Sequence, residues 1–231
     1  MDRRRLPCVL LAAALLLAPP AALAADDDVV PADKEPRHVP KLVNEWVRVV
    51  DVEIPEGEQT MFHRHSFDYP YVLMSDVTLY NQVYGQEPKD AKMQAGFIGY
   101  YDAATKGAYT HRFINRGPGV FRAIGIELLK PYARETMKLP PLAGAEMVID
   151  NARVGAYRIK LAPGESAGPM TIPGPSIRVS LGEGSISDRN GERIEATRLT
   201  TAQFAFREDP FTTTVTNTGD TPVELVEFVL K

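Results

Sequence analysis

Residues 60–69 of the chain read TMFHRHSFDY and contain two of its four histidines. One residue separates His63 from His65, and in an extended strand the side chains at i and i+2 point to the same face. The two imidazoles are therefore expected to lie side by side, where they can bind one ion. A third histidine, His111, lies in a similarly β-rich stretch far along the chain. These three histidines are the candidate site.

The chain around this stretch is made of short β-rich runs separated by Gly, Pro and Asp. Many short strands at close spacing are typical of an all-β sandwich or barrel rather than of alternating β and α units. One short helix is expected within residues 131–142, closed by Pro140 and Pro141. The expected strands are Trp46–Ile54, Gln59–His65, Tyr69–Met74, Val77–Val83, Gly96–Tyr101, Ala108–Asn115 and Val120–Leu129.

The second half of the chain repeats features of the first. The sequence IPEGE at 54–58 is echoed by LAPGE at 161–165, and VLMSD at 72–76 by VSLGE at 179–183. NRG at 115–117 is echoed by NTG at 217–219, again before an apolar strand. Three matches in one order indicate an internal duplication, with domains at 41–135 and 136–231. The alternative is convergence, because turns of this kind arise easily in β proteins.

The histidine motifs resemble those of the cupin superfamily. Gly57, five residues, and then His63-x-His65, followed by an acidic residue and Tyr71-Val72-Leu73, is similar to the first cupin motif. Residues 109–115 (YTHRFIN) are similar to the second motif, which ends in His-x3-Asn. The resemblance covers most of the chain and implies two tandem cupin-type jelly-roll barrels. The motif histidines occur only in the first copy.

The resemblance leaves the fourth ligand open. The glutamate of the first motif normally comes four residues after the second histidine, and that position is Tyr69. Alignment on the strand at 71–73 instead puts Asp68 in its place, and we favour Asp68 as ligand or nearby base. Strand parity argues against it, since residues 65 and 68 face opposite sides unless a bulge intervenes. The second motif also departs from the family, with Lys106-Gly107-Ala108 in place of Pro-x-Gly.

The second copy provides an internal comparison for these residues. The repeat offset of 107 places Met170, Ile172 and Pro175 opposite His63, His65 and Asp68. An offset of 102 places Thr213 opposite His111. Methionine prefers copper(I), and none of the four suits a harder divalent ion. The second copy thus keeps the turns and strands but loses every imidazole. The alternative for the first copy is a set of buried, hydrogen-bonded histidines without an ion.

The expected cofactor is one divalent transition metal held by His63, His65 and His111, with Asp68 completing the set or acting as a base. Three imidazoles leave coordination positions open, as catalytic rather than structural sites do. Iron, manganese, nickel, copper, cobalt and zinc all accept imidazole–carboxylate sites.

The first residues indicate export. Residues 1–24 combine a basic head, an apolar run too short for a membrane span and a small-residue cleavage signal, which predicts a signal peptide, with an uncleaved anchor as the alternative. The mature chain would be periplasmic or secreted and without thiols, because Cys8 is the only cysteine. Removal of three arginines and Asp2 takes the formal charge from −4 to −6. Residues 25–40 are expected to form an extended lead-in with a solvent-exposed His38.

These features predict partners and two classes of function. A small-molecule ligand or substrate is expected, with no nucleic acid, no membrane after cleavage, and a homo-oligomer as an open option. The first class is a metal-dependent enzyme, for which the cupin resemblance implies a dioxygenase, isomerase, decarboxylase or lyase. The second class is a binding module without turnover. Cupin barrels carry many unrelated activities, so the fold alone does not choose between them.

Overall fold

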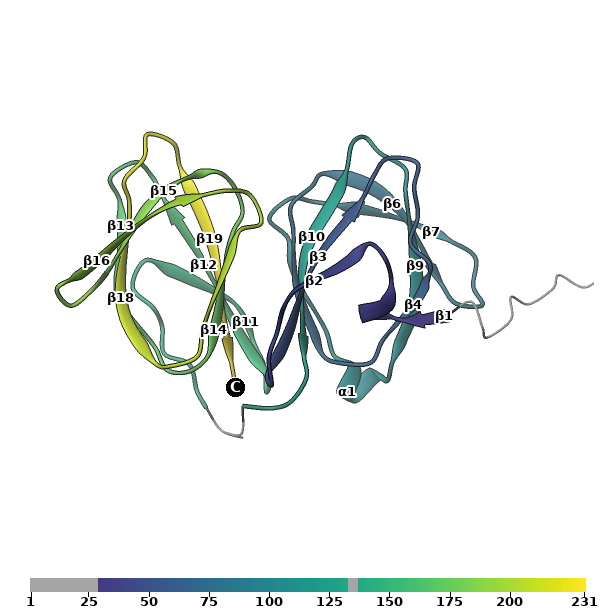
Figure 1. The fold of residues 1–231 in the computed structure, drawn as a ribbon, viewed down its shortest axis with the longest axis horizontal. Helices are drawn as coiled ribbons and strands as arrows, with labels where there is room; N and C mark the ends of the chain where they lie inside the picture. The colour runs from purple at the N-terminus through teal and green to yellow at the C-terminus, as the bar shows by residue number, and fades with distance from the viewer. Residues whose placement is uncertain (1–28, 133–136) are drawn as a thin grey trace, which may run out of the picture.

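The computed structural model describes residues 29–132 and 137–231, and in these ranges the chain forms two β-sandwiches side by side (Figure 1). The expected signal peptide lies outside the described residues, as does 133–136 of the expected helix. The first half contains β1 (Val29–Pro31), the 3-10 turn η2 (Ala32–Lys34), β2 (His38–Val43), β3 (Val47–Ile54), β4 (Phe62–His65), β5 (Tyr69–Leu73), β6 (Val77–Val83), β7 (Lys89–Met93), β8 (Ile98–Tyr101), α1 (Ala103–Lys106), β9 (Tyr109–Asn115) and β10 (Phe121–Leu128).

The second half repeats this order of strands. It contains β11 (Ala145–Asp150), β12 (Val154–Leu161), β13 (Ser166–Ile172), β14 (Ser176–Ser180), β15 (Gly184–Asn190), β16 (Arg193–Leu199), β17 (Phe204–Arg207), β18 (Phe211–Asn217) and β19 (Val223–Leu230). One sheet of the first half has the order β2-β3-β10-β5-β8, and its counterpart has the order β11-β12-β19-β14-β17. The other sheets have the orders β1-β4-β9-β6-β7 and β13-β18-β15-β16. Apart from β1, the two halves have the same topology.

Matching asparagines show that the repeat extends to single hydrogen bonds. Asn115 Nδ2 donates to the carbonyls of Ile54 and Gly119, both at 2.8 Å. Asn217 Nδ2 donates to the carbonyls of Leu161 and Thr221, at 3.0 and 2.8 Å. In each half the asparagine Oδ1 also accepts from the N–H two residues ahead. The two halves therefore share the hydrogen bonds of these turns as well as the order of their strands.

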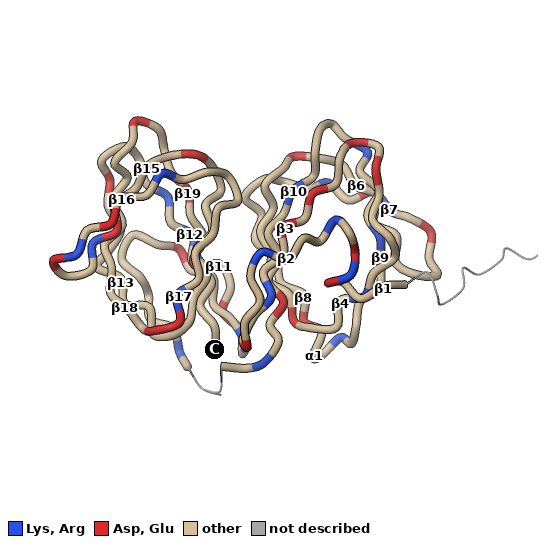
Figure 2. Tube along the Cα trace, viewed as in Figure 1, with Lys and Arg blue, Asp and Glu red and all other residues tan. Residues whose placement is uncertain are grey.

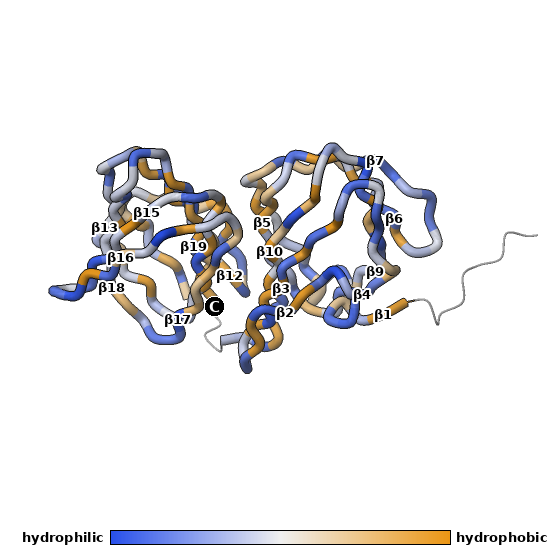
Figure 3. Tube along the Cα trace, turned by 45° about the horizontal axis from the view of Figure 1, so that its top comes forward, coloured by the Kyte–Doolittle hydropathy of each residue, from blue (hydrophilic) through white to orange (hydrophobic). Residues whose placement is uncertain are grey.

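The strands that join the two halves are buried on both faces, including Glu127 on β10 and Glu227 on β19. β10 and β19 are buried along nearly their whole length, because one face covers the interior of its own sandwich and the other covers the neighbouring half. Apart from these charged residues, Arg122 and Glu224, such doubly covered strands consist mostly of hydrophobic residues. One core cluster accordingly includes residues of both halves, among them Ile124, Ile126, Ile177 and Phe228. Figure 3 shows hydrophobic positions along β5, β10 and β12, where the halves meet.

The outer sheets alternate instead. β18 alternates between buried and more exposed positions along its seven residues, as expected for a strand with one solvated face. Figure 2 shows acidic and basic positions interspersed over both halves. Within residues 29–132 and 137–231, no helix is long and apolar enough to cross a membrane.

The segment expected as a lead-in takes part in the first sandwich. β1 pairs in parallel with β4 in one sheet, while β2 pairs with β3 in the other sheet. The residues between β1 and β2 therefore cross from one sheet to the other, and we call Val29–Val43 the strap. The strap is ordered by strand pairing at both ends, and its crossing brings His38 to the interior.

Candidate metal centre

Strand register brings together the three histidines predicted from the sequence. β4 and β9 are antiparallel neighbours, and His63 is paired directly with His111. Directly paired residues point to the same face of a sheet, as does His65, two residues from His63. The ring centroids of His63 and His111 are 4.5 Å apart, and those of His65 and His111 are 5.2 Å apart. All three side chains are buried.

A fourth histidine faces them from the opposite sheet. His38 on β2 is only 5 % exposed, so the expectation of a solvent-exposed residue was wrong. Its ring centroid lies 4.5 Å from that of His63 and 5.7 Å from that of His65. Ligand nitrogens of His38, His63 and His65 all lie within 4.8 Å of one another. The sandwich interior thus collects all four histidines of the chain.

Each of three imidazoles has an oxygen acceptor at Nδ1. His63 Nδ1 lies 2.9 Å from the Met61 carbonyl, His111 Nδ1 lies 2.9 Å from Asn81 Oδ1, and His38 Nδ1 lies 3.0 Å from Glu35 Oε2. An oxygen acceptor fixes the proton on Nδ1 and leaves the lone pair on Nε2, as outer partners of metal-bound histidines do. His63 Nε2 and His65 Nε2 are 3.1 Å apart. The donor set fits a divalent transition metal.

The surroundings of His63, His65 and His111 lower the pKa values of these rings and so favour their neutral form. Burial and then the charge of His38 lower the pKa of His63 to about 4. Burial, followed by the neighbouring histidines, holds the pKa values of His65 and His111 well below the usual range. Neutral imidazole is the form that binds a metal. His65 Nδ1 is buried and has no hydrogen-bond partner among the described residues. Buried polar atoms usually have one, so the protein alone does not satisfy this nitrogen.

Glu35 is a carboxylate that contacts this group through His38. Burial on its own would raise the pKa of Glu35, but His38 and the N–H groups of Arg37 and Met61 lower it overall. Its carboxylate therefore carries charge while it orients the His38 ring. An ion held by these imidazoles would have the Glu35 carboxylate behind His38.

Asp68 is not brought into the histidine group. Its Oδ2 accepts from Arg153 Nη1 at 2.7 Å, and its Oδ1 accepts from the N–H of Ala104 at 3.0 Å. Arg153 belongs to the second half, so Asp68 joins the two halves. This geometry argues against Asp68 as ligand or base. The physical reason is that the chain passes from β4 in one sheet to β5 in the other between His65 and Tyr69, so Asp68 pairs with Leu128. Tyr69 contacts the histidines instead, with its ring centroid 4.7 Å from that of His65.

A cavity of about 390 Å³ opens beside the histidines. Its walls are mainly aromatic and aliphatic, and His38, His65 and His111 contribute the imidazole edge. Tyr69 fits because Gly125 on β10 leaves room for its ring, since a Cβ there would lie 1.7 Å from the Tyr69 hydroxyl. Four tyrosines line this space: Tyr69, Tyr71, Tyr101 and Tyr109.

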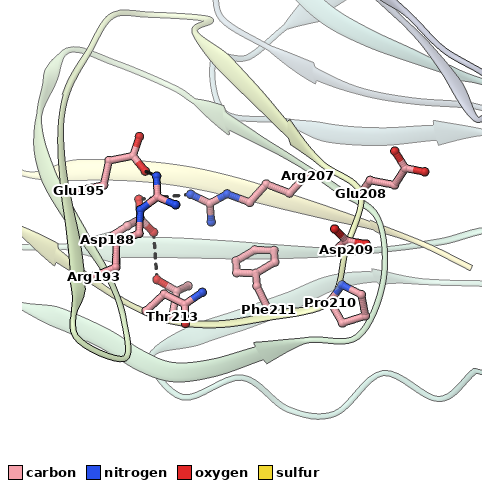
Figure 4. A pocket seen from close by; sticks show the side chains of 10 residues that line it. Asp188, Arg193, Glu195, Arg207, Glu208, Asp209, Pro210, Phe211 and Thr213 are labelled. Atoms are coloured by element: carbon pink, nitrogen blue, oxygen red, sulfur yellow. Dashed lines mark hydrogen bonds and ion pairs between the residues drawn. The ribbon is translucent and has the colours of Figure 1, made fainter.

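The second half fills the equivalent space with other residues. Register places Met170 opposite Thr213, as His63 lies opposite His111. Arg178, Asp188 and Glu227 occupy the positions of Tyr71, Asn81 and Gly125. Arg178 donates to both acids at 2.6 Å. Toward the surface, Asp188 also meets Arg207 and Thr213 in a charged pocket (Figure 4). The second half therefore has a buried ion network in place of the histidines.

In the metal-free protein, acid is expected to lower stability through His63. The folded pKa of about 4 lies below the ordinary 6.5, so between these values the unfolded chain binds a proton that the folded chain does not. Stability is then highest above pH 6.5 and falls as the pH approaches 4. The difference corresponds to about 3 kcal/mol.

Urea unfolding of chelator-treated protein at neutral and mildly acidic pH measures this effect. His63→Gln, which carries no titrating ring at this position, should lose less stability over the same interval. Equal losses in the two proteins would show that His63 does not contribute to the pH dependence.

Comparisons with known proteins bear on the fold. No protein-family model matches the chain, and no curated protein sequence does. Among solved structures, AerE from Microcystis aeruginosa matches with a TM-score of 0.57 at 13 % identity, over 85 % of this chain and 98 % of that one. A cupin 2 conserved barrel domain protein from Leptotrichia buccalis matches at 0.50 and 11 %, over 82 % and 86 %.

A third similar structure is that of a salicylate 1,2-dioxygenase from Pseudaminobacter salicylatoxidans. Its TM-score is 0.52 at 14 % identity, over 80 % of this chain and 71 % of that one. At such identities the likeness concerns the fold alone. The likeness spans both halves of the chain, and it agrees with the two β-sandwiches and their strand orders described above. The chain is an all-β protein with the cupin-type fold.

Proposed function

We propose that this protein is an exported, metal-dependent enzyme that acts on a small molecule in the cavity of its first half. The observation that carries the proposal is the set of three Nδ1 acceptors, Met61 O, Asn81 Oδ1 and Glu35 Oε2. They fix the proton of three buried and clustered imidazoles on Nδ1, and they leave each Nε2 available as a ligand. His38, His63, His65 and His111 would hold the ion.

A divalent ion in this position would polarise an oxygen-bearing substrate group or support oxygen chemistry beside it. The protein itself contributes the binding space and the exclusion of water. The cavity adjoins His65 and His111, and its aromatic walls bring a small ring or chain next to the imidazoles. Sites of this kind, largely apolar with a few placed polar groups, are typical of small-molecule binding.

A binding module without turnover is the second candidate. The residues that line the cavity include no carboxylate that could act as a general base, and this favours the binding module. Iron, manganese, nickel, copper, cobalt and zinc are all candidates for the metal.

The two candidates differ in turnover. Purified full-length mature protein, loaded in turn with each metal, should consume oxygen or convert a member of a panel of enols, diols and keto acids, and His111→Ala should abolish that conversion. A flat response across the panel, together with ligand-dependent shifts of the melting temperature, would contradict the enzyme and leave the binding module. Export is supported by the leader sequence and is tested by the mass of the mature chain, which should begin at Ala25.

A further inference from the structure

The cavity beside the histidines has walls without a lysine, arginine or carboxylate side chain. Apart from three imidazoles, its lining consists of aromatic and aliphatic residues and the amide of Asn81. No Lys, Arg, Asp or Glu is among the lining residues. A carboxylate, phosphate or ammonium group placed against these walls would lose hydration without meeting an oppositely charged lysine, arginine or carboxylate side chain, which costs several kcal/mol. The walls therefore select an uncharged molecular body.

A directed chain of hydrogen bonds leads from a histidine to one hydroxyl in this cavity. His111 Nδ1–H donates to Asn81 Oδ1 at 2.9 Å, and Asn81 Nδ2 donates to the Tyr109 hydroxyl oxygen at 2.8 Å. An amide has one acceptor and one donor end, so the first bond sets the direction of the second. The Tyr109 oxygen thus accepts from Asn81, and its own proton is free to donate elsewhere.

Tyr109 is placed to use that proton on a ligand. It lines the cavity together with His111, and the two ring centroids are 4.5 Å apart. No acceptor for its proton is found among the described residues. The neighbouring Tyr101 differs, since its hydroxyl donates to the Gly107 carbonyl at 3.0 Å. The two tyrosines share the cavity wall, but Tyr109 alone of this pair keeps an unused donor.

We propose that Tyr109, held by Asn81, donates a hydrogen bond to an oxygen of an uncharged aromatic ligand that lies among the tyrosines of the cavity. The proposal deepens the proposed function by naming its ligand class and a positioning residue, and it rests on that function for its biological meaning. The physical interaction needs only the cavity, because Tyr109 and Asn81 are oriented by protein atoms. Aromatic walls favour a flat ring through stacked or edge-to-face contacts.

The test compares two probes of nearly equal shape. Acetophenone carries a neutral carbonyl acceptor, whereas benzoate carries a carboxylate in its place. Calorimetric titration of the full mature protein, both chelator-treated and zinc-loaded, measures their affinities. In the chelator-treated protein acetophenone should bind and benzoate should bind at least tenfold more weakly. Tyr109→Phe should weaken acetophenone about three- to tenfold, as expected for one neutral hydrogen bond.

Tyr101→Phe is the matched comparison, because it removes a hydroxyl whose proton already goes to Gly107. Its effect on acetophenone should be smaller than that of Tyr109→Phe, and melting curves confirm that both variants fold. Equal effects of the two variants, equal affinities of the two probes in chelator-treated protein, or no binding of acetophenone would overturn the proposal. If the protein does not take up zinc but binds acetophenone in a way that depends on Tyr109, the Tyr109 proposal is supported. Only the metal-dependent function is then contradicted.

Discussion

Replacing His63 by alanine is expected to abolish the stabilisation of this protein by divalent metal ions. His63 is fully buried, lies between His38, His65 and His111, and has its Nε2 3.1 Å from that of His65. A ligand that binds only the folded state at a hundred times its Kd adds about 2.7 kcal/mol to stability. Thermal melts of chelator-treated protein with and without added zinc, cobalt or nickel measure this gain.

Met170→Leu is the matched control for this experiment. Met170 takes the position of His63 in the second half and is equally buried, while leucine conserves its volume closely. Wild type and Met170→Leu should both gain stability with metal, and His63→Ala should not. If His63→Ala responds to metal as strongly as wild type does, the ion binds elsewhere on the protein.

Replacing Arg178 by methionine is expected to destabilise the second half severely. The Arg178 guanidinium donates to Asp188 and Glu227 at 2.6 Å in the interior, and all three residues are buried. Loss of the cation leaves Glu227 without its ion-pair partner and Asp188 with only the more distant Arg207, at 3.9 Å. Breaking a buried pair by removing one partner costs about 3–5 kcal/mol. Chemical denaturation followed by circular dichroism measures the loss.

The triple variant Arg178→Met, Asp188→Asn, Glu227→Gln separates charge from packing. It keeps similar volumes but removes the uncompensated charges, so it should recover part of the stability that Arg178→Met loses. If the triple variant is no more stable than the single one, the loss arises from packing around Arg178 rather than from the buried charges.

The fold was largely predictable because its signals are local. Turns with proline and glycine (IPEGE and LAPGE) and Asn-x-Gly turns recur in both halves, and the structure shows Asn115 and Asn217 with matching hydrogen bonds. The offset of 102 that relates His111 to Thr213 is also correct, because both residues are paired with the first histidine position of their own half. Alternating and continuous apolar runs then distinguish outer sheets from the sheets that join the halves.

The site was only partly predictable because it depends on contacts between sheets. His63, His65 and His111 share one sheet and follow from strand spacing. His38 comes from the strap, where proline punctuation hides a strand, and its inward direction is set by pairing with Val52 on β3. The only available signal was the Glu35-x2-His38 pair in a chain with four histidines. Asp68 was misplaced because the sequence does not show that the chain passes from one sheet to the other between His65 and Tyr69.

Crystals of the zinc-loaded protein, measured on both sides of the zinc absorption edge, test the central claim most directly. The structure predicts one anomalous peak in the first half, bound by Nε2 atoms from the His38, His63, His65 and His111 group at about 2.0–2.1 Å. It predicts none among Met170, Ile172 and Thr213. An interior without a peak in the first half, or a peak bound by other residues instead, would contradict the claim that these histidines form a metal centre.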